Sequence, residues 1–289
     1  MLPNAIKLIE CPRDAMQGWS HFIPTDQKVA YIQQLLEVGF DTIDFGSFVS
    51  SKAIPQMADT KQVIEQLDVS STKTKLLAII ANERGAKEAL EYNAIQYLGF
   101  PFSVSETFQQ LNTNASISAA FEKVKNIQAL CEHNNKELVV YISMGFGNPY
   151  GDPYHEEIVF DWVHKLTDQG VKMVSLADTV GLANAKQVYA VCKELIQGLP
   201  HIEMGVHLHS SINHWKEKVD AALEAGCLRF DSAMKGIGGC PLAGNALVGN
   251  MNTEWLLNYF KELGILANIN ETAFNKSCDM ASKLFHAFE

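Results

Sequence analysis

The sequence from residue 172 to residue 208, KMVSLADTVGLANAKQVYAVCKELIQGLPHIEMGVHL, contains two short apolar runs on either side of an amphipathic segment. The runs KMVSL (172–176) and EMGVHL (203–208) have the length and the apolar content of buried strands. Between them, residues 185–197 place apolar side chains at helical spacing. A strand, a helix and a second strand in this order are typical of a parallel β-α-β unit.

The same pattern recurs along the whole chain. Further apolar runs of strand length lie at 6–10, 42–45, 75–80, 94–98, 138–143 and 228–233. Further helical segments are predicted at 25–38, 116–133, 156–169 and 215–225. Eight strands that alternate with helices favour the α/β class and a (β/α)8 TIM barrel. The alternative is a doubly wound open sheet, but that fold usually has fewer strands, and no GxGxxG motif follows the first run.

The C-terminal residues 252–289 continue beyond the eighth predicted strand. We expect them to form extra helices around 252–263 and 271–288, as an extension of one TIM-barrel domain that spans residues 1–289. Leu284, Phe285 and Phe288 give this segment an apolar face, which leaves a homo-oligomer open as a prediction.

The composition excludes several classes of protein. Of the 289 residues, 47% are hydrophobic and the net charge is −10, so a large core is expected and a nucleic-acid partner is not. No apolar run reaches about 18 residues, which argues against a membrane helix. The first residues, MLPNAIKLIECPRD, lack the features of a secretory signal, and the six cysteines contain no CxxC pair. These features are typical of a cytoplasmic protein with reduced thiols.

Polar residues collect at the ends of the predicted strands, where the active site of a TIM barrel forms. They are Arg13 and Asp14 after the first strand, Asp44 in the second, Asp178 after the sixth, His207 and His209 at the seventh, and Cys240, Asn245 and Asn250 after the eighth.

His207 and His209 are alternate residues of a predicted strand end, so their side chains project to the same face. Together with a carboxylate and an amide oxygen from other strand ends, they would give a mixed nitrogen and oxygen ligand set. Such a set suits Mg²⁺ or Mn²⁺ better than a structural zinc site. The structural alternative is a pair of hydrogen-bonded histidines near a turn.

Two other features also allow two interpretations. Arg13 and Asp14 are either a surface ion pair or, at the mouth of a barrel, a metal ligand beside a cation that stabilises a substrate oxygen. The segment GIGGCP (236–241) is either a flexible turn or an active-site lid that carries Cys240 as an acid–base candidate.

Five motifs together resemble the hydroxymethylglutaryl-CoA lyase family, within the metal-dependent TIM-barrel lyases and Claisen-type synthases. They occur in family order and cover roughly residues 6–265. The motifs are IECPRDAMQ (9–17), TIDFGSFVSSKAIPQMAD (42–59), SLADTVGLA (175–183), VHLHS (206–210) and KGIGGCPLAGNALVGNMNTE (235–254).

This resemblance implies a set of site residues and a bound Mg²⁺ or Mn²⁺. The implied metal ligands are Asp14, His207, His209 and Asn250. The implied catalytic residues are Arg13, Cys240, Asp178 and Asp44, the last in place of a family glutamate. Gln17 and Glu254 match positions close to the site and are expected to bind substrate.

The chain also departs from the family pattern. Ser210–Asn213 replaces the family's Asp-Thr-Tyr-Gly, and Gly18–Ser20 lacks the family's polar and basic residues. The spacing from Cys240 to Asn250 is one residue longer, so Asn245 is an alternative ligand. These departures bear on the acyl-CoA substrate more than on the fold.

The reaction implied by the resemblance is the cleavage of 3-hydroxy-3-methylglutaryl-CoA into acetyl-CoA and acetoacetate. Candidates for the proton transfer are Asp14, Asp178, His207 and Cys240. Two alternatives stay open at this point. One is a related metal-dependent lyase that acts on a different 3-hydroxyacyl thioester or a hydroxy acid, and the other is a catalytically silent barrel that binds a ligand.

Overall fold

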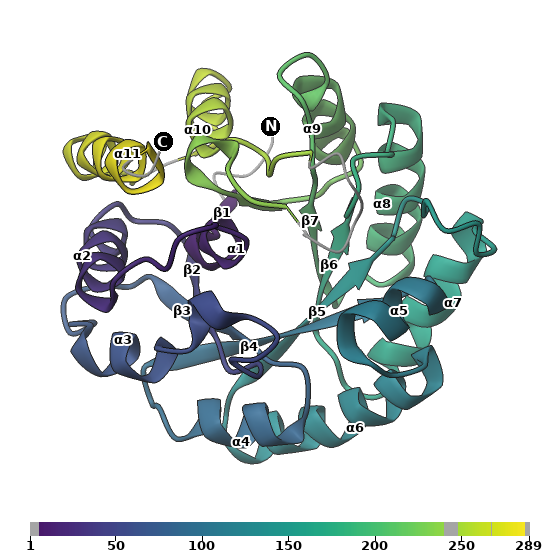
Figure 1. The fold of residues 1–289 in the computed structure, drawn as a ribbon. Helices are drawn as coiled ribbons and strands as arrows, with labels where there is room; N and C mark the ends of the chain where they lie inside the picture. The colour runs from purple at the N-terminus through teal and green to yellow at the C-terminus, as the bar shows by residue number, and fades with distance from the viewer. Residues whose placement is uncertain (1–5, 240–247, 267, 287–289) are drawn as a thin grey trace.

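The computed structural model describes residues 6–239, 248–266 and 268–286. Within them, parallel strands form a closed barrel in the order β1 to β8, and β8 pairs with β1. Figure 1 shows the helices as an outer ring around these strands, which confirms the predicted TIM barrel. The strands are β1 (Lys7–Glu10), β2 (Thr42–Ser47), β3 (Lys75–Ile79), β4 (Ile95–Ser103), β5 (Glu137–Ser143), β6 (Met173–Ala177), β7 (Glu203–His207) and β8 (Arg229–Ser232).

The longer helices follow the predicted segments closely, whereas several short ones were not predicted. The longer ones are α2 (Thr25–Leu36), α6 (Ile117–His133), α7 (Glu156–Thr167), α8 (Ala185–Gly198), α9 (Trp215–Glu224), α10 (Thr253–Glu262) and α11 (Glu271–His286). The short ones are α1 (Pro12–Gln17), η1 (Pro55–Met57), α3 (Thr60–Gln66), α4 (Glu83–Leu90), α5 (Glu106–Thr113) and η2 (Met234–Gly236). A helix of one or two turns contains too few apolar repeats to be recognised from the sequence. Tertiary packing, and not the local sequence, provides most of the stability of such short helices.

Helix α8 illustrates how local sequence sets an element. The side chain of Asn184 accepts a hydrogen bond of 3.0 Å from the backbone N–H of Gln187, which caps the helix. Such a cap contributes about 1 kcal/mol. Val188, Val191 and Leu195 then form the face that is buried against the barrel.

Strand β4 is longer than predicted. The prediction ended at Leu98 because Gly99 and Pro101 are poor strand formers. The strand nevertheless pairs with β5 as far as Ser103. A Cβ atom on Gly99 would lie 2.5 Å from Cδ1 of Ile79, so glycine lets the side chains inside the barrel pack closely there.

The C-terminal helices pack on the outside of the barrel. In α11, Phe285 is buried and its ring lies 5.2 Å from that of Trp19 and 6.4 Å from that of Tyr31. The apolar face predicted around Leu284 and Phe285 is therefore covered by the chain itself, and Phe288 lies outside the described residues.

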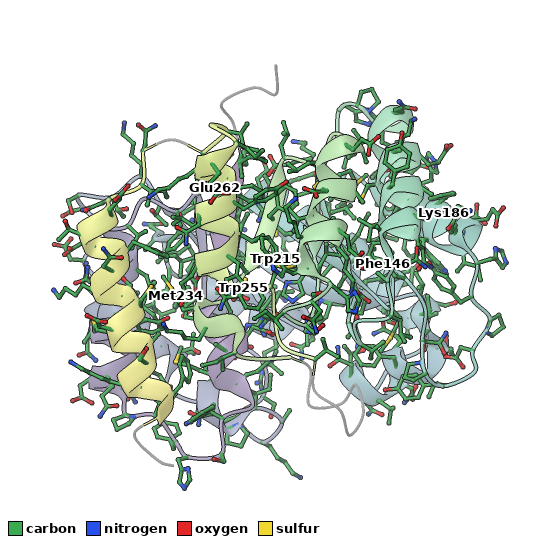
Figure 2. All side chains as sticks on the ribbon, turned by 90° about the horizontal axis from the view of Figure 1, so that it is seen from above. Phe146, Lys186, Trp215, Met234, Trp255 and Glu262 are labelled. Carbon is green, nitrogen blue, oxygen red and sulfur yellow. The ribbon has the colours of Figure 1, made fainter. Side chains whose placement is uncertain are left out.

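Helix α10 packs beside α9 through two tryptophans. The rings of Trp215 and Trp255 lie 5.7 Å apart, and Figure 2 labels both side chains. No helix among the described residues is both long and apolar enough to cross a membrane.

Candidate active site

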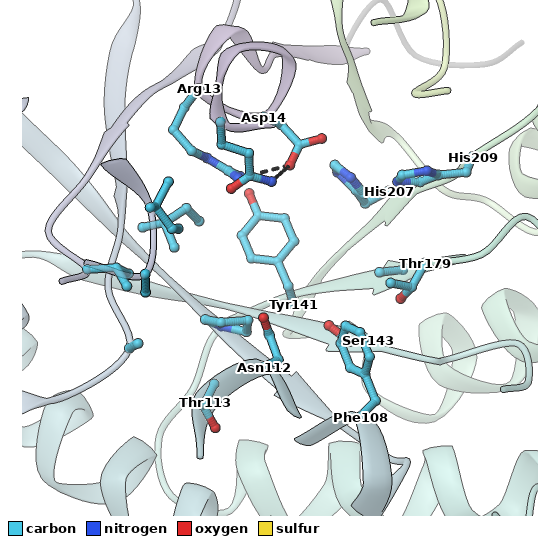
Figure 3. A pocket seen from close by; sticks show the side chains of 18 residues that line it. Arg13, Asp14, Phe108, Asn112, Thr113, Tyr141, Ser143, Thr179, His207 and His209 are labelled. Carbon is cyan, nitrogen blue, oxygen red and sulfur yellow. Dashed lines mark hydrogen bonds and ion pairs between the residues drawn. The ribbon is translucent and has the colours of Figure 1, made fainter. Parts of the chain in front are cut away.

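A cavity of about 270 Å³ opens at the C-terminal ends of the strands. Figure 3 shows charged and imidazole groups on one side of it, with Tyr141 in the middle. The polar side is lined by Arg13, Asp14, Gln17, His207 and His209. The remaining wall is mainly apolar and includes Val49, Ile54, Ile79, Pro101 and Phe108.

Arg13 lies between two carboxylates. Helix α1 begins with Pro12 directly after β1, which places Arg13 and Asp14 at the mouth of the barrel. Arg13 donates from Nη1 to Oδ1 of Asp14 at 2.9 Å, from Nε to Oδ2 of Asp44 at 3.0 Å, and from Nη2 to the same oxygen. All three residues are buried, so this pairing replaces the water that each charge would otherwise need.

The environment separates the pKa values of the two acids. Burial alone would raise the pKa of Asp14, but Arg13 and the two histidines outweigh it and lower the pKa to about 2. Burial dominates at Asp44 and raises its pKa to about 6, against the opposing effect of Arg13. Burial also opposes the charge of Arg13, but Asp44 and Asp14 outweigh it and raise the pKa of the guanidinium above its usual value.

Each of the two histidines uses its Nδ1 atom for a hydrogen bond within the protein. Nδ1 of His207 lies 3.1 Å from Oδ2 of Asp231, and Nδ1 of His209 lies 2.9 Å from the carbonyl oxygen of Val248. A carboxylate and a carbonyl can only accept, so Nδ1 carries the proton in both rings. The Nε2 atoms then keep their lone pairs, which is the tautomer that a metal-binding histidine needs.

Burial and charge affect the two rings differently. Burial would lower the pKa of His207, but the hydrogen bond and charge of Asp231 outweigh it and raise the pKa. For His209, burial and the neighbouring His207 lower the pKa. A neutral His209 is suited to bind a cation.

Asn250 joins this group from the end of the glycine-rich segment. It forms an antiparallel bridge with His209, and its Nδ2 atom donates to Oδ2 of Asp14 at 2.6 Å and to the carbonyl of Ile237 at 3.0 Å. Both bonds use the amide nitrogen, so the amide oxygen is the atom available to a ligand. Gly238 has a φ of +110°, and a Cβ there would lie 2.4 Å from Nδ2 of Asn250, so only glycine fits.

The donor set fits a divalent cation. A carboxylate from α1, two Nε2 atoms from the end of β7 and an amide oxygen from the segment after β8 lie at this mouth of the barrel, and each of the four residues has a supporting hydrogen bond. The oxygens of Asp14 are bonded to Arg13, Gln17 and Asn250.

A second cluster lies beside these donors. Among the described residues, one group of three acidic, cysteine or histidine side chains has all its ligand atoms within 4.8 Å of one another, namely Cys11, His207 and Asp231. Asp14, His207 and His209 lie further apart than that and would have to close around an ion. Cys11 is buried, and its Sγ atom lies within 4.8 Å of a ring nitrogen of His207.

Other predicted site residues lie elsewhere. Asp178 is buried and, like Asp44 and Asn250, is not among the residues that line the cavity; its Oδ2 atom accepts a 2.7 Å bond from Lys218. Glu254 accepts hydrogen bonds from the backbone N–H and the Nζ atom of Lys235, at 3.0 and 3.1 Å, and does not line the cavity either. Cys240 and Asn245 lie outside the described residues.

Two partners of the site were missed from the sequence. Asp231 supports His207, and Lys218 bridges Asp178 and the backbone of His209. A charged residue inside the buried strand β8 was a usable signal for Asp231, since such residues are rarely buried without a partner. Lys218 carried no signal, because lysine on a helix is ordinarily a surface residue.

The comparisons with known proteins place the chain in a family. The model of the HMGL-like family matches residues 6–280. The chain is 31% identical to hydroxymethylglutaryl-CoA lyase of Bacillus subtilis over 258 residues, which cover 89% of this chain and 85% of that protein. It is 30% identical to the cytoplasmic 3-hydroxy-3-methylglutaryl-CoA lyase of Homo sapiens over 270 residues, 93% of this chain and 72% of that protein.

Solved structures show the same similarity. The HMG-CoA lyase of Bacillus subtilis superposes with a TM-score of 0.92 at 28% identity, covering 98% of this chain and 95% of that one. An HMG-CoA lyase from Acenitobacter baumannii, solved in complex with coenzyme A and 3-methylmalate, has a TM-score of 0.90 at 31% identity and covers 98% of this chain and 92% of that one. The chain therefore belongs to the HMGL-like family and is an HMG-CoA lyase-like carbon–carbon lyase.

Proposed function

We propose that the protein cleaves 3-hydroxy-3-methylglutaryl-CoA into acetyl-CoA and acetoacetate with the help of Mg²⁺ or Mn²⁺. The observation that carries this proposal is the placement of Arg13 beside Asp14 and two histidines in one cavity. The acyl-CoA substrate is supported by the relative that was solved with coenzyme A and 3-methylmalate.

Asp14, His207, His209 and Asn250 are the residues that would hold the cation, with Asn245 as the alternative to Asn250. A bound divalent cation supplies Lewis acidity, which lowers the pKa of a substrate hydroxyl and orients it. The supporting contacts of these residues are the chain's own contribution, because they aim the Nε2 atoms and the Asp14 carboxylate before substrate arrives.

Arg13 is proposed to stabilise the thioester oxygen as it becomes an enolate oxygen. Its Nε, Nη1 and Nη2 atoms each hold a carboxylate, but both Nη atoms carry a second hydrogen that these bonds do not use. One such donor is worth about 3–4 kcal/mol in the transition state. Asp44 keeps the guanidinium in place by a bidentate contact, which is its proposed contribution to catalysis.

Two proton transfers accompany the cleavage. The hydroxyl loses its proton as the carbon–carbon bond breaks, and the methylene carbon of the enolate then gains a proton. Asp14 is a weak base, because its pKa is lowered to about 2. His207 would have both ring nitrogens occupied, Nδ1 by Asp231 and Nε2 by the cation, so we assign the protonation of the enolate carbon to Cys240. Gln17 is assigned to the support of Asp14 through its 2.8 Å hydrogen bond. Glu254 would act from outside the cavity, by holding Lys235 at the start of the glycine-rich segment.

A different 3-hydroxyacyl thioester or a hydroxy acid is the second candidate substrate. Among the described residues that line the cavity, Arg13 is the only Lys or Arg, and it is already paired with two carboxylates. The stretches Gly18–Ser20 and Ser210–Asn213 also depart from the family pattern, which has polar and basic residues in the first of them. These features would favour a substrate whose distal end carries no charge.

The test is a direct assay of acetyl-CoA formation from 3-hydroxy-3-methylglutaryl-CoA, with and without Mg²⁺ or Mn²⁺. We expect metal-dependent release of acetyl-CoA and acetoacetate in equal amounts. Activity only with other 3-hydroxyacyl thioesters would support the second candidate. Absence of cleavage with any thioester or hydroxy acid and any divalent ion would overturn the lyase proposal in favour of a silent barrel.

The compartment and the assembly stay predictions. The human relative is named as cytoplasmic and a mouse relative as mitochondrial. We propose a cytoplasmic location, which fractionation of cells that express the tagged protein would test. The oligomeric state is open to measurement by sedimentation.

A further inference from the structure

Lys218 and Asp178 form a buried ion pair behind the wall of the cavity. The Nζ atom of Lys218 lies 2.7 Å from Oδ2 of Asp178, and the side chains are only 4% and 1% exposed. Lysine is almost never buried to this degree without a specific partner, because its charge must be compensated. The question is therefore what the pair does at this position.

The pair contacts the backbone of the predicted metal-binding segment at two points. Lys218 Nζ donates a second hydrogen bond, of 2.9 Å, to the carbonyl oxygen of His209. The backbone N–H of Asp178 donates at 3.0 Å to the carbonyl oxygen of His207. Together, Asp178 and Lys218 hold the carbonyl on each side of Leu208, and the imidazoles of His207 and His209 point into the cavity.

Both partners are held in place from outside the pair. Lys218 lies in the first turns of α9, and Trp215 at the start of this helix packs against Trp255 of α10 (Figure 2). The Oδ1 atom of Asp178 accepts a 3.1 Å bond from the backbone N–H of Ala183 in the loop after β6. The ammonium group thus connects α9, the loop after β6 and the end of β7 at one point.

We propose that Lys218, together with Asp178, is a positioning residue that orients His209 for binding a divalent cation. The ring of His209 is held at Nδ1 by Val248 and its backbone carbonyl by Lys218, so loss of Lys218 removes the bond at this carbonyl and leaves the bridge to Asn250 as the main-chain support. This inference rests on the proposed metal site. It replaces a role in proton transfer for Asp178, whose carboxylate faces Lys218 instead of the cavity.

A second buried lysine provides a matched control. Lys28 Nζ donates to Oδ1 of Asp59 at 2.6 Å and to the backbone carbonyl of Gln56, so it also joins a carboxylate and a carbonyl inside the protein. It supports the loop after β2 and contacts neither histidine. Lys28→Met therefore removes the same chemistry without touching the predicted ligands.

The experiment compares Lys218→Met, Lys28→Met and the double variant Lys218→Met/Asp178→Asn with the unaltered protein. The Mn²⁺ dissociation constant is measured from the electron paramagnetic resonance signal of free Mn²⁺, and stability from the thermal unfolding temperature. We expect Lys218→Met to bind Mn²⁺ about 10–100-fold more weakly, the range seen when a supporting partner of a ligand is removed. Lys28→Met should lower the unfolding temperature but leave the dissociation constant within about twofold of the starting value.

The double variant separates positioning from stability. It carries no unpaired buried charge, so its unfolding temperature should recover relative to Lys218→Met. Its Mn²⁺ affinity should stay weak, because the bond to the His209 carbonyl is still missing. The double variant also reports the affinity if Lys218→Met alone does not fold.

Three results would overturn the inference. The first is unchanged Mn²⁺ affinity in the Lys218 variants, and the second is a double variant that recovers its affinity together with its stability. The third is an unaltered protein that does not bind Mn²⁺. The proposed reaction is tested separately, since Mn²⁺ binding is measured without substrate. Weak Mn²⁺ binding by the variants together with no cleavage by the unaltered protein would leave the positioning role standing and remove the proposed reaction.

Discussion

Oδ2 of Asp231 lies 3.1 Å from Nδ1 of His207, although the two residues are 24 positions apart along the chain. The carboxylate holds the imidazole so that Nε2 faces away from it. Asp231 is itself buried, and Ser175 makes a longer contact of 3.4 Å to the same oxygen. This arrangement matches the carboxylate–histidine pairs that support metal ligands in other proteins.

Replacement of Asp231 by asparagine is expected to weaken Mn²⁺ binding by about 10–100-fold, because the amide no longer enforces the ring orientation and tautomer. Electron paramagnetic resonance of free Mn²⁺ measures this. Ser175→Ala is the control, since it removes the weaker contact and keeps the carboxylate. Equal affinity of Asp231→Asn and Ser175→Ala would contradict the role of Asp231.

Arg13→Met is expected to lower kcat by about 10²–10³-fold, the effect of losing one donor of about 3–4 kcal/mol to a developing oxyanion. The assay is acetyl-CoA release from 3-hydroxy-3-methylglutaryl-CoA. Arg84→Met is the control, because the side chain of Arg84 is 72% exposed and forms a surface ion pair with Glu88. Near-normal turnover of folded Arg13→Met protein would end the proposed role.

Glu10 predicts a dependence of stability on pH. Burial raises the pKa of this carboxyl from 4.5 to about 8, although it accepts bonds from Thr253 and from the backbone N–H of Met234. Between these pH values the unfolded chain is ionised at Glu10 and the folded protein keeps the proton. The free energy of unfolding should therefore fall as pH rises from about 4.5 to about 8.

Glu10→Gln removes this titration while it preserves the shape of the side chain. We expect the free energy of unfolding of the variant to rise relative to that of the unaltered protein as the pH increases. The relative gain is about 1.4 kcal/mol per pH unit and reaches up to about 5 kcal/mol at pH 8. Urea unfolding at pH 5 and pH 8 measures the difference. A difference that does not change between the two pH values would refute the prediction.

Gly238→Ala is expected to weaken Mn²⁺ binding by at least tenfold and to lower the unfolding temperature. The added Cβ would lie 2.4 Å from Nδ2 of Asn250 and 2.9 Å from the carbonyl oxygen of Asp14, so at least one of these two residues must move.

Gly264→Ala is the matched control for this prediction. Gly264 also has a positive φ, of +67°, but among the described residues no atom beyond its two chain neighbours lies within 4 Å of the place that a Cβ would occupy. Its replacement should cost only the backbone strain, about 1 kcal/mol, with unchanged Mn²⁺ affinity. If both variants bind Mn²⁺ equally well, the close approach at Gly238 is not important for the site.

Local patterns in the sequence determined the barrel and the general location of the site. Apolar runs such as 138–143 and the helical spacing in 185–197 depend only on neighbouring residues, so they predict strands and helices without tertiary information. The end of each strand then locates the polar residues, since all parallel strands of a barrel end on the same face. This is why Arg13, His207 and His209 were found and do lie around one cavity.

Tertiary structure alone decided which partner each of these residues has. Asn250 meets Asp14 across 236 positions of the chain, and Lys218 meets Asp178 across 40. The hydrophobic periodicity of the sequence does not predict such contacts, because they depend on barrel closure and on the direction in which each side chain leaves its backbone. The same reason explains why Asp178 was expected in the cavity and instead pairs with Lys218: the end of a strand specifies the face of the barrel, but not the atom that a side chain meets there.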